Sequence, residues 1–462
     1  MNRLLLRLAT LAVPMAVAAV SEPIIDFTRP IGKVKPIHGV GNSPVRLDYE
    51  GKGLVPEFAE AGIPYVRLHD AVGAFGGAHY VDVENIFPDM DADENDPQSY
   101  DFAFTDAYIK TLIDSGVQIF YRLGPTIENQ WRVKSYHVRR PKDLAKFARV
   151  CEHIVRHYNK GWANGFRYGI EYWEVWNEPE VEGMWQGTKE EFFDLYREIA
   201  VLLKKEHPEI KVGGYSSIGF SYIDDPVASA GWKDRVEWFL DFCDYVTAEK
   251  TRCPIDYFTW HCYVNRGGKV GRIRRHAEFV RKTLDEHGLT GVESILAEWN
   301  TRLFGYEGMR DHRGGAFAAK VLSIMQYTSI DKAMFYAAQP NAFYCGLYDF
   351  PSEATTPIFE VFREWNRFCQ MGEAYAVPDG DETLGYAAVG GNRWKSVMIV
   401  NFKDRADAVK PAFKGIRDYA RFMVRRIDAA HTAPTSVGMH TPGNVVDLPP
   451  WSVTYLNTFE RE

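Results

Sequence analysis

The sequence predicts an α/β protein, a (β/α)8 barrel followed by a smaller all-β domain of sandwich type. The chain of 462 residues is long enough for a barrel and a small partner domain. Short apolar segments alternate with amphipathic segments of helical period from about residue 35 to residue 365. After Gly372 the hydrophobic period changes to two, which is typical of antiparallel strands.

The barrel prediction depends on the number of strand–helix units. Repeated units of this kind favour a parallel sheet covered by helices, and eight of them close a barrel. In chain order, the candidate strands are Pro36–Val40, Tyr65–Leu68, Gln118–Arg122, Tyr172–Trp176, Lys211–Gly214, Tyr257–His261, Ser294–Ala297 and Lys332–Tyr336.

Amphipathic segments with apolar residues three and four apart follow several of these strands. Thr188 and Glu191 have the spacing of a capping box and predict a helix start. The clearest helical segments are Lys142–Tyr158, Glu190–Glu206, Phe317–Gln326 and Ile358–Phe368.

An open, doubly wound sheet is the competing architecture. Such a sheet often carries a glycine-rich phosphate-binding turn after its first strand. Here that turn spans residues 39–44, lacks the third glycine, and contains Pro44, which would disrupt an opening helix. The turn therefore favours the closed barrel.

The C-terminal region has alternating strands and a hairpin turn at residues 390–392. We expect a leader over residues 1–20, a segment 21–34 that adds a strand to the β-domain, the barrel over 35–371 and the β-sandwich over 372–462. The expected strands are Thr383–Val389, Lys395–Asn401, Arg421–Asp428, Asn444–Leu448 and Ser452–Asn457.

Charge and the N-terminal residues bear on partners and compartment. Lys and Arg number 54 and acids 62, so the net charge is −8, which argues against nucleic acid as a partner. Arg3 and Arg7 precede an apolar stretch that is too short to span a bilayer, and Ala16-Val17-Ala18 suits a signal cleavage site. We expect a secreted or periplasmic protein without membrane spans, although a frayed amphipathic start is an alternative for residues 1–20.

The six cysteines are scattered and form no CxxC pair. Cys243 and Cys253 are close enough in sequence to form a disulfide in an exported protein, and buried free thiols are the alternative. The sequence predicts no metal site and no cofactor.

Two glutamates follow predicted barrel strands. Glu178 comes after the fourth strand and Glu298 after the seventh, and these strand ends lie across one mouth of a regular barrel. Glycosidic bond cleavage requires one protonated and one ionised carboxyl group at such a site. The alternative is that each glutamate caps a helix or pairs with an arginine.

The motifs at four strand ends resemble those of glycoside hydrolase family 39, a clan A family that includes β-xylosidases and α-L-iduronidases. The similarity covers nearly the whole barrel and extends to the β-domain, and the combination of motifs is more specific than the Asn-Glu-Pro triplet alone. The motifs are YVRLHD (65–70), WEVWNEPE (173–180), DYFTWHCY (256–263) and ILAEWNT (295–301).

The resemblance implies a retaining mechanism and assigns roles to individual residues. Glu178 would act as general acid and then as general base, and Glu298 as the nucleophile. Asn177 would hold the 2-hydroxyl of the sugar. The expected partner is a carbohydrate.

Four further residues complete the implied site. Tyr263 would hydrogen-bond Glu298, and Arg67 would favour its ionised state. His69 would contact sugar hydroxyls. His261 would touch Glu178 or the sugar, and a barrel-lining structural histidine is the alternative.

The sequence leaves the sugar and the oligomeric state open. The region 337–344 lacks the acidic run of the family's xylosidases, and the insert from Gly73 to Tyr100 favours a pocket and exo action. The basic run Lys269–Arg275 fits a solvated surface. Weaker candidates for the mouth are Glu128, Trp131, Gln339, Asn341, Tyr344, Asp311 and His312.

The sequence alone leaves two alternative functions, a sugar-binding protein and an unrelated barrel enzyme. A non-catalytic sugar-binding protein on the same scaffold would normally lose one of the two carboxylates, and both are present. An unrelated barrel enzyme would need paired metal ligands or a glycine-rich phosphate cradle, which the sequence does not offer.

Overall fold

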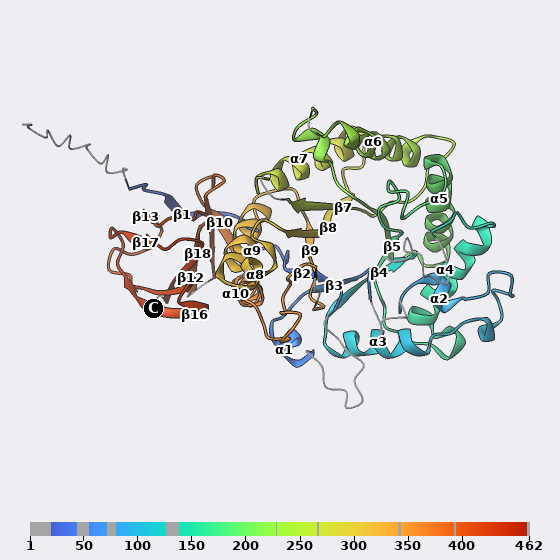
Figure 1. The fold of residues 1–462 in the computed structure, drawn as a ribbon, viewed down its shortest axis with the longest axis horizontal. Coiled ribbons are helices and arrows are strands. Elements are labelled where there is room, and N and C mark those ends of the chain that lie inside the picture. The colour runs from blue at the N-terminus through green and yellow to red at the C-terminus, as the bar shows by residue number, and fades with distance from the viewer. Residues whose placement is uncertain are drawn as a thin grey trace, which may run out of the picture.

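The computed structural model describes residues 20–43, 55–71, 80–125, 138–227, 229–265, 268–340, 343–391 and 394–459. Within these residues the chain forms a barrel region and a β region that lie beside each other (Figure 1). Most of the proposed leader, residues 1–19, lies outside the described residues.

The first region is a closed barrel of eight parallel strands, which confirms the predicted barrel and excludes the open sheet. Each strand pairs with the next along the chain, and the last pairs with the first. The strands are β2 (Gly39–Gly41), β3 (Tyr65–Leu68), β4 (Gln118–Leu123), β5 (Tyr172–Val175), β6 (Lys211–Ser217), β7 (Tyr257–Val264), β8 (Glu293–Thr301) and β9 (Lys332–Tyr336).

Helices surround the barrel (Figure 1). The predicted capping box is present, since Thr188 Oγ1 accepts a hydrogen bond from the Glu191 backbone N–H and the Glu191 carboxylate accepts one from that of Thr188. The α-helices are α1 (Val55–Glu60), α2 (Val83–Ile86), α3 (Ala103–Asp114), α4 (Leu144–Lys160), α5 (Lys189–Glu206), α6 (Lys233–Thr247), α7 (Arg272–Glu286), α8 (Gly305–Arg310), α9 (His312–Met325) and α10 (Pro357–Met371).

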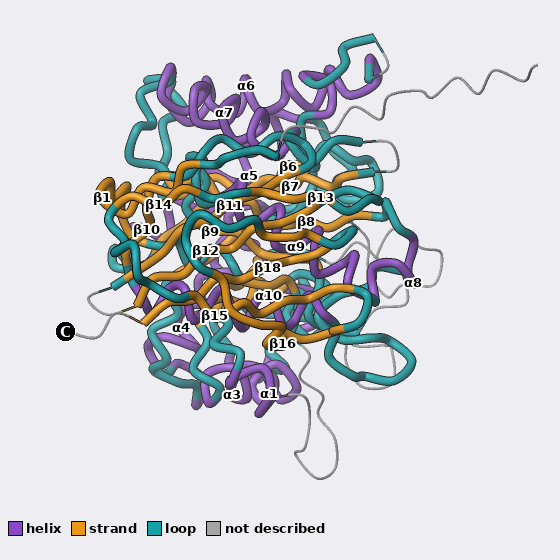
Figure 2. The backbone as a smooth tube through the Cα atoms, turned by 90° about the vertical axis from the view of Figure 1, so that its left-hand side faces the viewer, coloured by secondary structure: helices purple, strands orange, loops and turns teal. Residues whose placement is uncertain are grey.

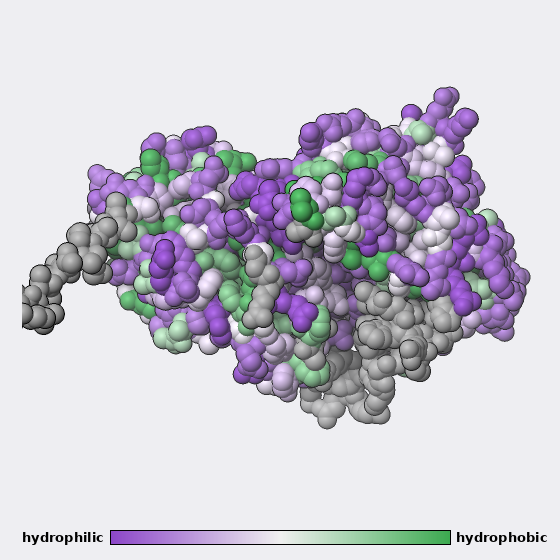
Figure 3. All heavy atoms as spheres, turned by 45° about the horizontal axis from the view of Figure 1, so that its top comes forward, coloured by the Kyte–Doolittle hydropathy of each residue, from purple (hydrophilic) through white to green (hydrophobic). Residues whose placement is uncertain are grey.

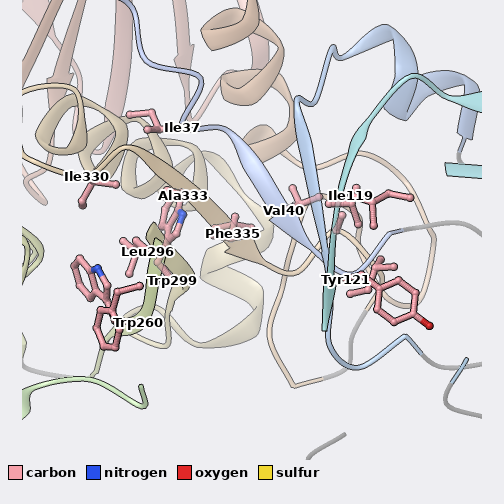
Figure 4. Close-up of a cluster of buried hydrophobic side chains, with 14 of the residues drawn as sticks. Ile37, Val40, Ile119, Tyr121, Trp260, Leu296, Trp299, Ile330, Ala333 and Phe335 are labelled. Carbon is pink, nitrogen blue, oxygen red and sulfur yellow. The ribbon is translucent and has the colours of Figure 1, made fainter. Parts of the chain in front are cut away.

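Successive side chains of each barrel strand point alternately toward the helices and toward the barrel axis, which gives the barrel two apolar layers. Side chains that face the helices form a continuous core, part of which is labelled in Figure 4, where Trp260, Leu296 and Phe335 come from neighbouring strands. Inside the barrel, a separate cluster fills the lower end and closes it beneath the mouth. Its members are Tyr65, Phe120, Tyr172, Tyr257, Ile295 and Met334.

The β region contains one eight-stranded sheet and a two-stranded ribbon of β13 and β17. The sheet order is β14-β1-β10-β11-β12-β18-β15-β16, and its strands cross the front of Figure 2. The strands are β1 (Ile24–Lys33), β10 (Glu373–Ala376), β11 (Leu384–Gly390), β12 (Trp394–Asn401), β13 (Asp407–Val409), β14 (Ala412–Lys414), β15 (Phe422–Asp428), β16 (His431–His440), β17 (Val446–Leu448) and β18 (Ser452–Phe459).

The second layer of this region is therefore only a two-stranded ribbon. The predicted strands omitted three short ones, β10, β13 and β14, and the ten-residue β16. Residues of β13 and β17 pack on Ile25, Tyr386 and Leu456 to form a small second core. The segment after the leader forms β1, which pairs with β10 and with β14.

Two buried polar contacts join the sheet region to barrel helices. Arg425 of β15 donates to Glu364 of α10, with Nη1 and Oε1 3.0 Å apart. Lys320 of α9 donates to the backbone carbonyls of Asp381 and Leu384, each at 2.6 Å. Unpaired charges at these buried positions would be costly, so both contacts help fix the two regions together.

Other features bear on the remaining expectations. All six cysteines are free thiols, so Cys243 and Cys253 are not joined in this structure. Among the described helices, none is both long and apolar enough to cross a bilayer. The face of the molecule shown in Figure 3 is mainly hydrophilic, with apolar residues in small patches.

Candidate active site

The end of β5 turns sharply and places Glu178 at the barrel mouth. Trp176 and Glu178 both have positive φ, 69° and 46°, which is uncommon for residues with a side chain beyond Cβ. The backbone N–H of Glu178 donates to the Ser216 carbonyl of β6 at 3.1 Å and holds the turn. Such backbone conformations are retained mainly at functional sites.

A bulge in β8 places Glu298. Trp260 pairs with Leu296, whereas the next residue of β7, His261, pairs with Glu298, so Ala297 is an extra residue in β8. Strict alternation would point Glu298 to the same side as Leu296, toward the helices. The extra residue instead turns Glu298 into the barrel and Trp299 into the outer core, as bulges near active sites do.

This geometry corrects the predicted end of the seventh strand. We expected the strand to stop at Ala297 with Glu298 just beyond it, whereas β8 continues to Thr301. Glu298 therefore belongs to the strand, and its direction depends on the bulge.

Glu178 and Glu298 face each other with His261 between them. One side-chain atom from each of the three residues lies within 4.8 Å of the other two. His261 Nδ1 is 2.7 Å from Glu178 Oε1, and His261 Nε2 is 3.5 Å from Glu298 Oε1. All three side chains are nine-tenths buried or more.

Arg67 supports the site from below. Its guanidinium donates to Glu174 at 2.6 Å, to Glu298 at 2.8 Å and to Asn177 Oδ1 at 2.7 Å. It also donates to Ser216 Oγ at 2.8 Å, and Ser216 in turn donates to Glu174. Burial opposes the charge of Arg67, but the two glutamates raise the pKa of its guanidinium above its usual value.

Tyr263 completes the surroundings of Glu298. Its hydroxyl donates to Glu298 Oε2 at 2.6 Å. Burial, together with the charge of Glu298, raises the pKa of Tyr263 well above its usual range, so the phenol keeps its proton. Glu298 thus accepts hydrogen bonds from a cation and a phenol, and both favour its ionised form.

Glu178 has a different environment. Burial raises the pKa of Glu178 to about 7, and the positive charge of Arg67 only partly opposes this effect. Burial also lowers the pKa of His261 to about 4, so His261 is neutral at neutral pH and gives Glu178 no positive charge. One carboxyl group is therefore suited to carry a proton, while the other accepts hydrogen bonds from a cation and a phenol.

The remaining wall of the site comes from β2, β3 and β9. The backbone N–H groups of His69 and Asp70 donate to Asn42 Oδ1, at 3.3 and 3.1 Å. The Tyr336 hydroxyl donates to Asp70 at 2.7 Å, and His69 Nε2 lies 3.3 Å from the same carboxylate. These contacts fix the His69 imidazole at the edge of the mouth.

A cavity of about 600 Å³ opens above the two glutamates, a size that suits a small ligand. It contains polar groups from six barrel strands or their loops and an aromatic rim. The lining residues that the argument uses are His69, Asp70, Asn177, Glu178, Trp232, His261, Tyr263, Glu298, Tyr336, Phe343 and Tyr344.

The structure brings all seven predicted site residues together. Six of them line the cavity, and Arg67 lies beneath it in contact with two of the others. Tyr344 also lines the cavity, whereas Asp311 caps α9 and pairs with Arg313. His312 and Gln339 are absent from the described lining, and Glu128, Trp131 and Asn341 lie outside the described residues.

Several participants were not predicted from the sequence. Glu174 and Asp70 lie within the motifs at 173–180 and 65–70 but were given no role, and Ser216 lies outside all four motifs. Burial raises the pKa of Glu180 to about 8, so a second carboxyl group near Glu178 also holds its proton at neutral pH. A charged residue between large apolar residues in a barrel strand was the available signal for Glu174.

The same three side chains could be considered as metal ligands, because their donor atoms are close together. However, the guanidinium of Arg67 already supplies a positive charge 2.8 Å from Glu298. A divalent cation there would meet strong repulsion, so the arrangement favours acid–base and nucleophilic chemistry.

The described chain is similar to known sequences. Residues 47–301 match the family model of glycosyl hydrolases family 39. A β-xylosidase of Caldicellulosiruptor saccharolyticus is 29% identical over 379 residues, which are 73% of this chain and 72% of that protein. A β-xylosidase of Geobacillus stearothermophilus is 26% identical over 217 residues, which are 44% of this chain and 37% of that protein's length.

Solved structures share the fold at low sequence identity. A glucosidase from Croceicoccus marinus superposes with a TM-score of 0.73 at 20% identity, covering 96% of this chain and 99% of that one. A monomeric β-xylosidase from Caulobacter crescentus CB15 gives a TM-score of 0.69 at 16% identity, with 96% and 100% covered. These similarities extend over both the barrel and the β region.

Proposed function

The chain belongs to the glycosyl hydrolases of family 39, and we propose that it cleaves glycosidic bonds with retention of configuration, using Glu178 as acid and base and Glu298 as nucleophile. The observation that carries the proposal is the short distance between the two carboxyl groups, whose nearest oxygens are within 4.8 Å. Retaining glycosidases need about 5–5.5 Å between these groups, whereas inverting ones need roughly 6.5–9.5 Å to admit a water.

The first step forms a bond between Glu298 and the anomeric carbon of the sugar. As the glycosidic bond breaks, Glu178 transfers its proton to the departing oxygen, and the sugar remains as an ester of Glu298. The pKa of Glu178, raised to about 7, supports this role because a substantial fraction of the acid is still protonated at neutral pH.

The second step releases the sugar. Glu178, now ionised, takes a proton from a water molecule, and the water oxygen attacks the anomeric carbon while the bond to Glu298 breaks. Arg67 and Tyr263 stabilise the returning negative charge on Glu298. Two displacements at one carbon restore the original configuration.

Asn177 is placed to hold the sugar between the two carboxyl groups. Its Oδ1 accepts from Arg67, so its amide N–H₂ points away from that contact and remains a donor for a sugar hydroxyl. His69 and Tyr336 present further polar groups to the same cavity. We propose a terminal sugar in this pocket and exo action.

The relatives in sequence support a β-xyloside as the first substrate to examine. Activity on aryl β-D-xyloside, α-L-arabinofuranoside and β-D-glucoside should be compared, and the first-formed anomer followed by NMR. We expect a β-glycoside to release a β-sugar before mutarotation. Release of the α-anomer would overturn the retaining mechanism, and binding without hydrolysis of any glycoside would favour a sugar-binding protein.

A further inference from the structure

A second cavity of about 310 Å³ adjoins the catalytic one. The two cavities share four lining residues, so a ligand can extend from one into the other. The shared residues are Ser221, Trp232, Asn265 and Arg272.

The second cavity is rich in positive charge, although the whole chain carries a net charge of −8. Its lining contains three cations, Lys269, Arg272 and Arg275, and a single carboxylate, Asp224. Burial disfavours the charge on Asp224, but hydrogen bonds from His276 and Arg275 lower the pKa of its carboxyl group well below the usual range. One negative charge therefore faces more than one positive charge.

The three cations differ in how much of their binding capacity is used. Arg272 is already engaged at all three nitrogens, because it donates to Asp224 through Nε, to the carbonyl of Tyr263 through Nη1 and to Ser221 Oγ through Nη2. Arg275 contacts Asp224 through Nε and Nη2, and within the described part of the chain its Nη1 makes no hydrogen bond. Lys269 is exposed and has no carboxylate within 4 Å among the described residues.

The location of this cavity relative to Glu178 indicates which part of a substrate it receives. β6 is the neighbour of β5 in the barrel, and residues 218–221, which follow β6, line the catalytic cavity. Glu178, just after β5, gives its proton to the leaving oxygen in the proposed reaction. The leaving group therefore departs toward the β6 and β7 loops, where the second cavity lies.

We propose that the second cavity is a leaving-group subsite for an acidic sugar, with Lys269 and Arg275 binding the carboxylate of a uronic acid. The Trp232 ring, which lines both cavities, offers an aromatic surface beside the pyranose ring. A guanidinium with free N–H groups and an ammonium are the side chains that bind carboxylates most strongly. This inference deepens the proposed function and rests on it for the direction of the leaving group.

Binding can be measured without turnover. Methyl β-D-glucuronide and methyl β-D-glucoside differ in charge at C6 but have the same ring, and their binding to the full-length protein can be compared by calorimetry. We expect the glucuronide to bind more tightly and the preference to fall when NaCl is raised to about 0.5 M. Equal or weaker binding of the glucuronide would overturn the subsite, whatever the catalytic activity.

Variants of Lys269 and Arg275 test whether these two residues cause the preference for the glucuronide. Lys269→Gln and Arg275→Gln should each weaken glucuronide binding by roughly threefold to tenfold and leave glucoside binding unchanged. Lys282→Gln is the matched control, because Lys282 is 74% exposed and lies on the same helix about 15 Å from its start. An equal loss in the control would show a general charge effect and contradict the proposal.

Kinetics then distinguish this inference from the proposed function. Disaccharides of the preferred terminal sugar on glucuronate or on glucose should both be cleaved, the first with the higher kcat/KM. A Lys269→Gln enzyme should lose the preference and keep its activity on the neutral disaccharide. Hydrolysis of both disaccharides at equal rates would leave the proposed function standing and overturn the acidic subsite.

Discussion

At the scale of single residues, two glutamates acquire different chemistry from their neighbours. Glu178 is buried beside a neutral imidazole, and burial raises its pKa to about 7. Glu298 accepts from a guanidinium and a phenol. The sequence predicted both residues and both partners of Glu298, because strand-end motifs carry them. It assigned no role to Glu174, which lies in the motif at 173–180 and accepts a hydrogen bond from Arg67 Nε.

The environment of Glu178 predicts the pH dependence of the reaction. The protonated form of Glu178 is the active acid, so kcat/KM on a substrate with a poor leaving group should fall as pH rises through about 7. Well above this pH the decrease should approach about tenfold per pH unit. A pH profile of kcat/KM measures the effect.

The control for this profile is a dinitrophenyl glycoside, whose leaving group departs without a proton. Its hydrolysis should show no such decrease between pH 7 and pH 9 if the group that titrates is the general acid. The same decrease with both substrates would assign the titration to another residue and contradict the role of Glu178.

At the scale of elements, short irregularities direct the catalytic side chains. The bulge at Ala297 turns Glu298 inward, and the positive φ angles of Trp176 and Glu178 turn β5 into its loop. Apolar periodicity predicted the eight barrel strands to within a few residues. It could not predict the bulge, because an extra residue leaves the local pattern of apolar and polar residues almost unchanged.

Helix ends, by contrast, depend on contacts between residues that are close in the sequence, so the sequence can predict them. Thr188→Ala should lower the free energy of unfolding by about 1 kcal/mol, because it leaves the Glu191 backbone N–H without its acceptor. Since α5 lies outside the barrel, kcat should not change. Denaturant unfolding and steady-state kinetics measure the two quantities.

Thr188→Ser keeps the hydroxyl and serves as the control for the cap. It should retain most of the stability of the wild-type protein. Equal destabilisation by serine and alanine would show that the lost methyl group, and not the hydrogen bond, accounts for the effect.

At the scale of the whole molecule, the order of elements was predictable and the spaces between them were not. Eight strand–helix units followed by short strands predicted the barrel and the β region in the correct order. The thin second layer of the β region and the cavity beside Lys269 depend on contacts between segments far apart in the chain. A basic run such as 269–275 appears as solvated surface in sequence until the fold places it next to the mouth.

The central claim is that Glu298 becomes covalently attached to the sugar. A 2-deoxy-2-fluoro glycoside with an activated leaving group slows both displacements, the second enough to let the glycosyl-enzyme accumulate for peptide mass spectrometry. We predict one sugar per protein chain, attached to the peptide that contains Glu298, and none on the Glu298→Gln variant. An adduct on another carboxylate would contradict the account. So would hydrolysis of the fluoro glycoside without loss of enzyme activity and without any adduct.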